Sequence, residues 1–256
     1  MAAGTEPKIA VIGLKKSFGE KPVLRGIDLE IMPGESLVLV GGSGAGKSVF
    51  LKHLIGLLLP DEGHVIVDGI DLTLAEPSVA LRLRKKFGMS FQEGALFDSM
   101  TVFGNIAFPL RRHTDMDQAA VAARVRECLE LVRLENVEDR YPAELSGGMR
   151  RRVGFARAIA LEPDILLFDE PTTGLDPINT AVIARLINRM RRELRVTAVT
   201  ITHDMNLAWK VADRLAMLRE GRIIALDDPE GFRTSPDPYV RAFLEGEVID
   251  EEEVAV

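Results

Sequence analysis

The sequence of 256 residues has only one cysteine and four histidines. One cysteine excludes a disulfide within the chain. Cys128 falls on an apolar helical stripe, which predicts a buried and unreactive thiol. The stripe also contains Val121, Val125 and Val132. The histidines have no cysteine or carboxylate partners at ligand spacing, which argues against a structural metal site.

Long apolar runs are also absent from the sequence. The longest, residues 54–59, is interrupted by Gly56 and closed by Pro60, whereas a transmembrane helix needs about 20 apolar residues. The opening residues "MAAGTEPKIAVIG" do not have the basic-then-apolar order of a secretory signal. We therefore expect no membrane span and a cytoplasmic location.

Positive charge is in deficit, since 32 lysines and arginines face 39 acidic residues and leave a formal net charge of -7. No global attraction to nucleic acid is expected from such a chain. The length and the 46% hydrophobic content suffice for one large core, with or without a smaller subdomain. Without repeats or low-complexity linkers, we predict a single domain over residues 1–245 and a solvated acidic tail over residues 246–256.

Hydrophobic patterning predicts a mixed α/β fold. Residues 8–40 alternate between apolar and polar positions with turns between them, which is typical of several strands. From about residue 93 to 161 the period is helical, which predicts an inserted helical subdomain. Strand and helix patterns then alternate from residue 165 to 226, and this alternation predicts a mostly parallel sheet with covered faces.

The stretch "GGSGAGKS", residues 41–48, has the G-x-x-x-x-G-K-[ST] spacing and stands between an apolar strand pattern and a helix. Glycines allow successive backbone N–H groups to surround a phosphate, and the helix N-terminus adds partial positive charge. We expect Lys47 to reach the β- and γ-phosphates and Ser48 to bind Mg²⁺. The alternative is an ordinary glycine-rich turn followed by a surface lysine.

Three further sequence positions place polar side chains at strand ends. The run "ILLFDE" ends in Asp169 and Glu170, which leave the strand in different directions. We assign Asp169 to Mg²⁺ and Glu170 to the attacking water as general base. Gln92 and His203 each end a strand pattern, and ligands of open α/β sheets bind at that edge. Both are expected to sense the γ-phosphate, although either could be an ordinary loop residue.

A second glycine-rich helix start, "LSGGMRRRV", lies about a hundred residues after the first and also suits an anion. The arginines that follow it are consecutive, so they point about 100° apart on a helix and cannot form one nucleic-acid stripe. Some of them are expected to pair with acidic groups across the helical subdomain rather than to contact DNA. These residues are Arg150, Arg151 and Arg152.

Taken in order and spacing, "GGSGAGKS", Gln92, "LSGGM", "ILLFDE", "TGLD" and His203 resemble the nucleotide-binding subunit of an ABC transporter over about residues 8–244. The resemblance implies a P-loop NTPase core of the RecA-like type, an antiparallel β subdomain and the helical insertion. It implies a head-to-tail homodimer that hydrolyses ATP with Mg²⁺, in which the second helix start of one subunit caps the γ-phosphate held by the other.

The same resemblance implies a set of site residues. Phe18 would stack on adenine, Asp176 would lie at the dimer interface, and Gln92 would join Ser48 and Asp169 around Mg²⁺. The nucleotide-binding residues that it implies are Phe18, Gly41, Ser43, Gly44, Ala45, Gly46, Lys47, Ser48, Val49, Ser146, Gly147 and Gly148. The family usually has glutamine where this chain has Met149, so any polar contact of that glutamine is in question here.

A narrower resemblance comes from residues 90–114, "LSGGM" and "DPYVRAFLEG", which look like the MlaF-like ATPases of MCE-type phospholipid transport systems. It implies an integral membrane permease, an MCE-type lipid-binding protein and a peripheral place at the cytoplasmic face of the inner membrane. The segment after Gln92 is unusually apolar, and it either contacts the permease or packs inside the helical subdomain. Its apolar residues are Leu96, Phe97, Met100, Phe103 and Phe108.

Two other functions remain open at this stage. ABC ATPases also act in DNA repair and chromosome organisation, although those chains usually carry two cassettes, long coiled coils or zinc-binding insertions. The alternative within transport is a different small substrate, such as an amino acid, a metal ion or a drug.

Overall fold

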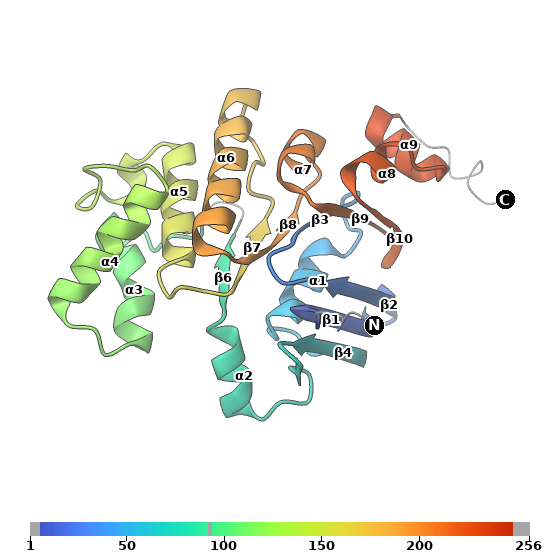
Figure 1. The fold of residues 1–256 in the computed structure, drawn as a ribbon, viewed down its shortest axis with the longest axis horizontal. Helices are drawn as coiled ribbons and strands as arrows, with labels where there is room; N and C mark the ends of the chain where they lie inside the picture. The colour runs from blue at the N-terminus through green and yellow to red at the C-terminus, as the bar shows by residue number, and fades with distance from the viewer. Residues whose placement is uncertain (1–5, 92–93, 248–256) are drawn as a thin grey trace.

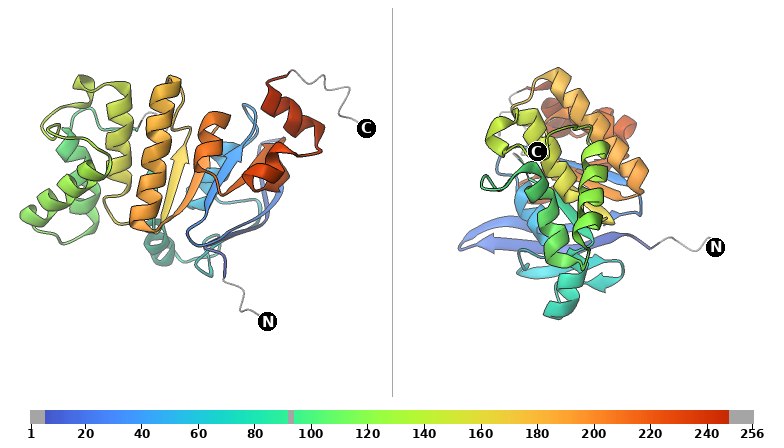
Figure 2. Two further views of the ribbon diagram at one scale, coloured as in Figure 1. Left: turned by 45° about the horizontal axis from the view of Figure 1, so that its top comes forward. Right: turned by 90° about the vertical axis from the view of Figure 1, so that its left-hand side faces the viewer.

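The computed structural model describes residues 6–91 and 94–247, which are drawn in colour in Figure 1. Over these residues the strands form two sheets, one with the order β2-β1-β4-β5 and one with the order β10-β9-β3-β8-β7-β6. The predicted mixed α/β core, the strands before residue 40 and the helical segment are all present. Helices α3 to α5 lie at one end of the molecule, and α8 and α9 lie at the other (Figures 1 and 2).

The first sheet is antiparallel and consists of β1 (Ile9–Phe18), β2 (Lys21–Ile31), β4 (Glu62–Val67) and β5 (Ile70–Asp71). Its strands alternate between buried apolar and exposed polar residues, as expected of a sheet with one face on a core. The buried face packs with the helices α1 (Lys47–Leu54) and α2 (Pro77–Arg84) against one side of the second sheet.

The second sheet is the centre of the molecule. Its parallel strands are β3 (Ser36–Val40), β6 (Phe87–Ser90), β7 (Ile165–Asp169), β8 (Thr197–Ile201) and β9 (Arg214–Arg219), and β10 (Arg222–Asp227) adds an antiparallel edge. β3 and β8 are buried at every residue. Near-continuous apolar runs are typical of strands that are covered on both faces.

The other face of the central sheet carries α6 (Pro177–Leu194), α7 (Met205–Val211) and the helical segment. That segment contains α3 (Val102–His113), α4 (Gln118–Leu131), the short 3₁₀ helix η1 (Pro142–Glu144) and α5 (Gly147–Ala158). The predicted burial of Cys128 is confirmed: its side chain is 1% exposed, and burial raises the pKa of the thiol to about 11.

Two helices near the C-terminus, α8 (Pro229–Arg233) and α9 (Pro238–Glu245), have no counterpart in the sequence-based expectations. Both begin with an Asp-Pro pair whose aspartate caps the helix. They are too short for hydrophobic periodicity to reveal them. None of the helices within the described ranges has both the length and the apolar composition needed to span a bilayer.

Candidate active site

The site lies at one edge of the central sheet, where β3, β7 and β8 end side by side. The backbone N–H of Glu170 donates to the carbonyl of Ile201 at 2.9 Å, and that of Thr202 donates to Leu39 at 3.2 Å. The parallel ladder therefore brings the residues that follow three separate strands to one place. The glycine loop, the carboxylate pair and His203 are neighbours because of strand order, as their strand-end positions predict.

The glycine loop requires glycine at both of its ends. Gly41 has φ 155°, and a Cβ there would lie 2.2 Å from the carbonyl oxygen of Leu218. Gly46 has φ 106°, and a Cβ there would lie 3.0 Å from a methyl carbon of Leu24. Gly46 precedes α1 without capping it by a side chain. Amides at an uncapped helix start can bind an anion.

Lys47 bends back over this loop. Its Nζ donates to the carbonyls of Gly41 at 2.7 Å and Gly42 at 2.9 Å, and it lies 3.9 Å from Oε1 of Glu170. Burial lowers the pKa of Lys47, and the carboxylates of Glu170 and Asp169 oppose that shift. A buried ammonium held mainly by neutral carbonyls is well suited to bind an incoming phosphate, because the phosphate supplies the charge that the carbonyls lack.

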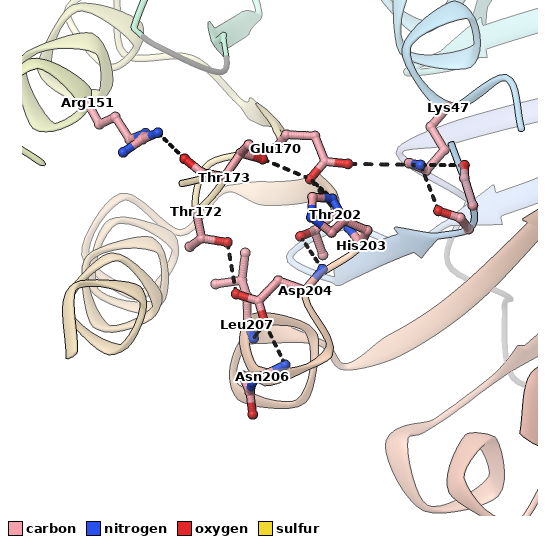
Figure 3. Close-up of polar contacts among 12 residues, drawn as sticks. Lys47, Arg151, Glu170, Thr172, Thr173, Thr202, His203, Asp204, Asn206 and Leu207 are labelled. Atoms are coloured by element: carbon pink, nitrogen blue, oxygen red, sulfur yellow. Dashed lines mark hydrogen bonds and ion pairs between the residues drawn. The ribbon is translucent and has the colours of Figure 1, made fainter. Parts of the chain in front are cut away.

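Glu170 is held from three directions (Figure 3). Its Oε2 lies 2.9 Å from Nδ1 of His203 and accepts longer hydrogen bonds, both 3.4 Å, from the backbone N–H of His203 and the hydroxyl of Thr173. The backbone of Glu170 has φ 48°, a conformation that is uncommon outside glycine and is often found at functional sites. The carboxylate is thereby aimed across the strand ends toward Lys47.

Asp169 and Ser48 form a second pair in the same region. The Ser48 hydroxyl acts to lower the pKa of the Asp169 carboxylate. Burial raises the pKa of Asp169, and the adjacent Glu170 carboxylate raises it further. A carboxylate and a hydroxyl are oxygen ligands of the kind that Mg²⁺ prefers, and a bound cation would oppose the rise in the pKa of Asp169. The donor set therefore fits the predicted metal.

A cavity of about 580 Å³ opens over the glycine loop and Glu170, and Gly41 and Asp169 do not line it. The predicted residues in its lining are Ser43, Gly44, Ala45, Gly46, Lys47, Ser48, Val49, Glu170 and His203. Val23, from β2, also lines it; no sequence signal marks this strand residue. Phe18 does not line the cavity, but its ring is 49% exposed at the end of β1, with Nζ of Lys16 5.8 Å from the ring centroid.

The second helix start lies in a different cavity, of about 770 Å³. Ser146 caps α5 by accepting a hydrogen bond from the N–H of Met149 at 3.3 Å. Gly147, Gly148 and residues 173–175 also line this cavity, which shares no lining residue with the first one. Within one chain, the two predicted phosphate-binding helix starts therefore serve separate cavities. Asp176, directly after Leu175 of this cavity, caps α6.

Two of the three consecutive arginines, Arg150 and Arg152, have backbone partners in place of the acidic partners expected for some of them. Arg150 donates to the carbonyl of Leu145 at 2.7 Å and Arg152 to that of Arg133 at 3.0 Å, and neither forms an ion pair with any described residue. Backbone carbonyls near the helix offer fixed acceptors that sequence patterns do not reveal. Arg151 donates to the carbonyl of Thr173, next to the loop that holds Glu170 (Figure 3). The predicted site residue Gln92 lies outside the described residues.

The known proteins that this chain resembles are ATP-binding proteins of transport systems. The family model described as "ABC transporter" matches residues 24–173. The "Probable ribonucleotide transport ATP-binding protein mkl" of Mycobacterium leprae is 44% identical over 238 residues, which cover 93% of this chain and 69% of that protein. The chain spans 66% of the length of the Mycobacterium tuberculosis counterpart.

The "Intermembrane phospholipid transport system ATP-binding protein MlaF" of Escherichia coli is 39% identical over 228 residues, 89% of this chain and 85% of that protein. Among solved structures, the dimeric post-hydrolysis state of the ATP-binding cassette MJ0796 bound to ADP and Pi has a TM-score of 0.79 and 31% identity. The similarity covers 86% of this chain and 98% of MJ0796.

Proposed function

This chain belongs to the ABC transporter family of ATP-hydrolysing proteins, and on that premise we propose that it powers phospholipid transport across a cell envelope. The observation that carries the ATPase part is the approach of Lys47, Glu170 and His203 beneath one cavity. The observation that carries the cargo is the similarity to MlaF over most of both chains.

In the proposed reaction, the amides of the glycine loop and of the start of α1 bind the phosphates of ATP, and Lys47 neutralises the β- and γ-phosphates. Glu170 accepts the proton of the attacking water, as general base. His203 holds the Glu170 carboxylate by its 2.9 Å contact and would sense the γ-phosphate by contacting it. Ser48 and Asp169, with Gln92, would hold Mg²⁺, which when bound neutralises phosphate charge. Phe18 would stack on adenine.

The proposed active form is a head-to-tail homodimer. Ser146, Gly147 and Gly148 of one subunit would cap the nucleotide that lies on the glycine loop of the other, with Asp176 at the interface. The separation of the two cavities within one chain supports this assembly. The second helix start does not line the cavity of its own glycine loop, so it can meet a nucleotide only on the glycine loop of another subunit. The dimeric MJ0796 cassette, 31% identical, supports it independently.

The proposed partner is a membrane permease with an MCE-type lipid-binding protein, at the cytoplasmic face of the inner membrane. Phe97 and Phe108 support a contact in the segment after residue 93. Their rings are 5.0 Å apart, each is 42% exposed, and the Arg157 guanidinium lies 5.7 Å from the Phe97 ring. A fully buried Asn105 fixes the backbone of this segment at Phe97, whereas Leu96 and Phe103 of the same segment pack against the core.

This segment is also connected to the second helix start. A Cβ on Gly154 of α5 would lie 2.8 Å from Cα of Gly94, so the two backbones are in contact. Arg157 of α5 donates to the carbonyl of Gly94 at 2.7 Å. A movement of α5 when the dimer closes on ATP would therefore move the segment that carries Phe97.

A different transport cargo is the second candidate, because the mycobacterial relatives are named for ribonucleotide transport at 44% identity. The deciding experiment is purification of the native complex, with identification of its subunits and extraction of bound molecules. An MCE-type protein and enriched phospholipid are expected. A complex that holds nucleotides or another small substrate, without phospholipid, contradicts the proposed cargo and leaves the ATPase assignment intact.

A further inference from the structure

The last helix, α9, places Tyr239 beside the glycine loop. A small cavity of about 280 Å³ is lined on one side by loop residues 42–45 and on the other by Arg219, Glu220 and Tyr239. Three of these loop residues, 43–45, also line the larger cavity proposed for ATP. The loop therefore borders two cavities, the larger one proposed for ATP and a smaller one lined by Tyr239 and Arg219.

Tyr239 comes close to the loop backbone. Its Oη lies 3.6 Å from the position that a Cβ on Gly42 would occupy. The Arg219 guanidinium lies 4.0 Å from the centroid of the Tyr239 ring, a stacked cation–π arrangement. Arg219 is the last residue of β9 and follows Leu218, whose carbonyl oxygen is close to Gly41. The end of β9 and Tyr239 thus support consecutive residues of the loop.

The position of Tyr239 is fixed by its own helix. Asp237 caps α9 by accepting hydrogen bonds from the N–H groups of Tyr239 at 2.8 Å and Val240 at 3.1 Å. Val240 is fully buried, and Phe243 packs on the same core one turn later. The backbone at Tyr239 is therefore anchored at both the cap and the core, and its ring reaches the loop from a rigid base.

We propose that Tyr239, stacked on Arg219, is a positioning residue that holds the glycine loop in its phosphate-binding shape. The inference rests on the ATP site proposed above. Residues 41, 42 and 44 are glycines without side chains of their own, so the loop backbone needs external support to keep its amides aimed at one point. Tyr239 packs against the core and does not line the nucleotide cavity, so any effect of its side chain on ATP binding must pass through the loop.

The test is the dissociation constant of ATP and the steady-state KM and kcat of four variants of the full chain. Tyr239→Ala is expected to raise the Kd and KM of ATP about tenfold, since a loop that is no longer held in its binding conformation must be ordered when ATP binds. The kcat at saturating ATP should fall less than the affinity, because Glu170 and His203 do not belong to the loop. Arg219→Ala should act similarly, and the double variant should add little, because the two side chains work as one unit.

Phe243→Ala is the matched control, since it removes an aromatic ring of the same helix that faces the core and not the loop. It should lower the Tm without the rise in KM. An equal rise in KM in Phe243→Ala would show that docking of α9 is what matters and would overturn the inference. If Tyr239→Ala does not fold, Tyr239→Phe keeps the ring but removes Oη, the atom that approaches Gly42, and is expected to raise the Kd for ATP; an unchanged Kd in that variant also overturns the inference.

The outcomes separate this inference from the proposed function. If the parental protein binds no ATP, both the proposed function and the positioning role of Tyr239 are wrong. A parental protein that binds and hydrolyses ATP, with an unaltered KM in the Tyr239 and Arg219 variants, removes only the positioning role.

Discussion

Nδ1 of His203 lies 2.9 Å from Oε2 of Glu170, although the two residues are 33 positions apart and follow different strands. The contact exists because β7 and β8 are adjacent parallel strands. It fixes the direction of the Glu170 carboxylate. A base that is oriented in advance needs no reorganisation at the moment of proton transfer.

Replacing Glu170 by Gln tests the base. Gln keeps the shape of the side chain and can still hydrogen-bond to His203, but it cannot accept a proton. We expect ATP binding to persist while hydrolysis falls by about 10²- to 10⁴-fold. Phosphate release and ATP affinity are the measurements, and Glu162→Gln, on an exposed side chain, is the control. Hydrolysis at the parental rate in Glu170→Gln would show that another group is the base.

Mixing two inactive variants tests the shared site. Lys47→Ala removes the phosphate contact and Ser146→Arg blocks the cap, so each alone should hydrolyse little ATP. In a mixed dimer, both defects fall in one of the two sites, and the other site is intact. The mixture should therefore regain part of the parental rate in an ATPase assay. Activity in either single variant, or none in the mixture, is incompatible with a head-to-tail dimer.

Ser146 also caps α5, so its replacement by Arg costs helix stability of about 1 kcal/mol. Ser146→Asp provides the control for that effect. Aspartate is a good N-cap, and its charge repels a phosphate. This variant should keep the parental Tm and still lose hydrolysis, which separates loss of the nucleotide contact from loss of the fold.

Phe97→Asp tests the proposed permease contact. The exposed edge of the ring would meet the partner, and a carboxylate desolvated at an apolar contact costs several kcal/mol. We expect transport and permease-stimulated hydrolysis to be lost while the chain alone binds ATP normally. Leu74→Asp, at a side chain that is 75% exposed, is the control and should have little effect. Loss of ATP binding in Phe97→Asp would mean that the ring is part of the core.

His53 links stability to pH. Its side chain is 1% exposed, Nδ1 lies 2.7 Å from the carbonyl oxygen of Val49, and burial lowers its pKa below 6.5. Lys16 lowers that pKa further, and Asp61 opposes the shift. As pH falls below 6.5, the unfolded chain takes up a proton that the folded chain does not. The free energy of unfolding therefore decreases toward acid.

His53→Leu should remove this contribution. The drop in Tm between about pH 7.5 and about pH 5.5 should be smaller in the variant than in the parent. His113→Gln, at the exposed last residue of α3, is the control and should keep the parental drop. The same drop in His53→Leu and the parent would show that His53 does not carry this pH dependence.

Features that depend on neighbouring residues could be predicted from the sequence. The glycine loop follows from the conformations that only glycine adopts easily at Gly41 and Gly46, and the limits of α6 follow from its Asp-Pro start and its periodicity. The buried strands follow from their apolar runs. The division into residues 1–245 and an acidic tail stays a prediction.

Features that depend on residues far apart in the chain were decided by the tertiary structure. Strand order puts His203 beside Glu170. Packing puts Tyr239, from the short helix α9, beside the glycine loop. Arg150 and Arg152 of α5 donate to backbone carbonyls, and the positions of these acceptors depend on how the chain folds. The physical reason is that periodicity and turn chemistry act over a few residues, whereas a catalytic contact or a supporting ring depends on which distant strands and helices pack together.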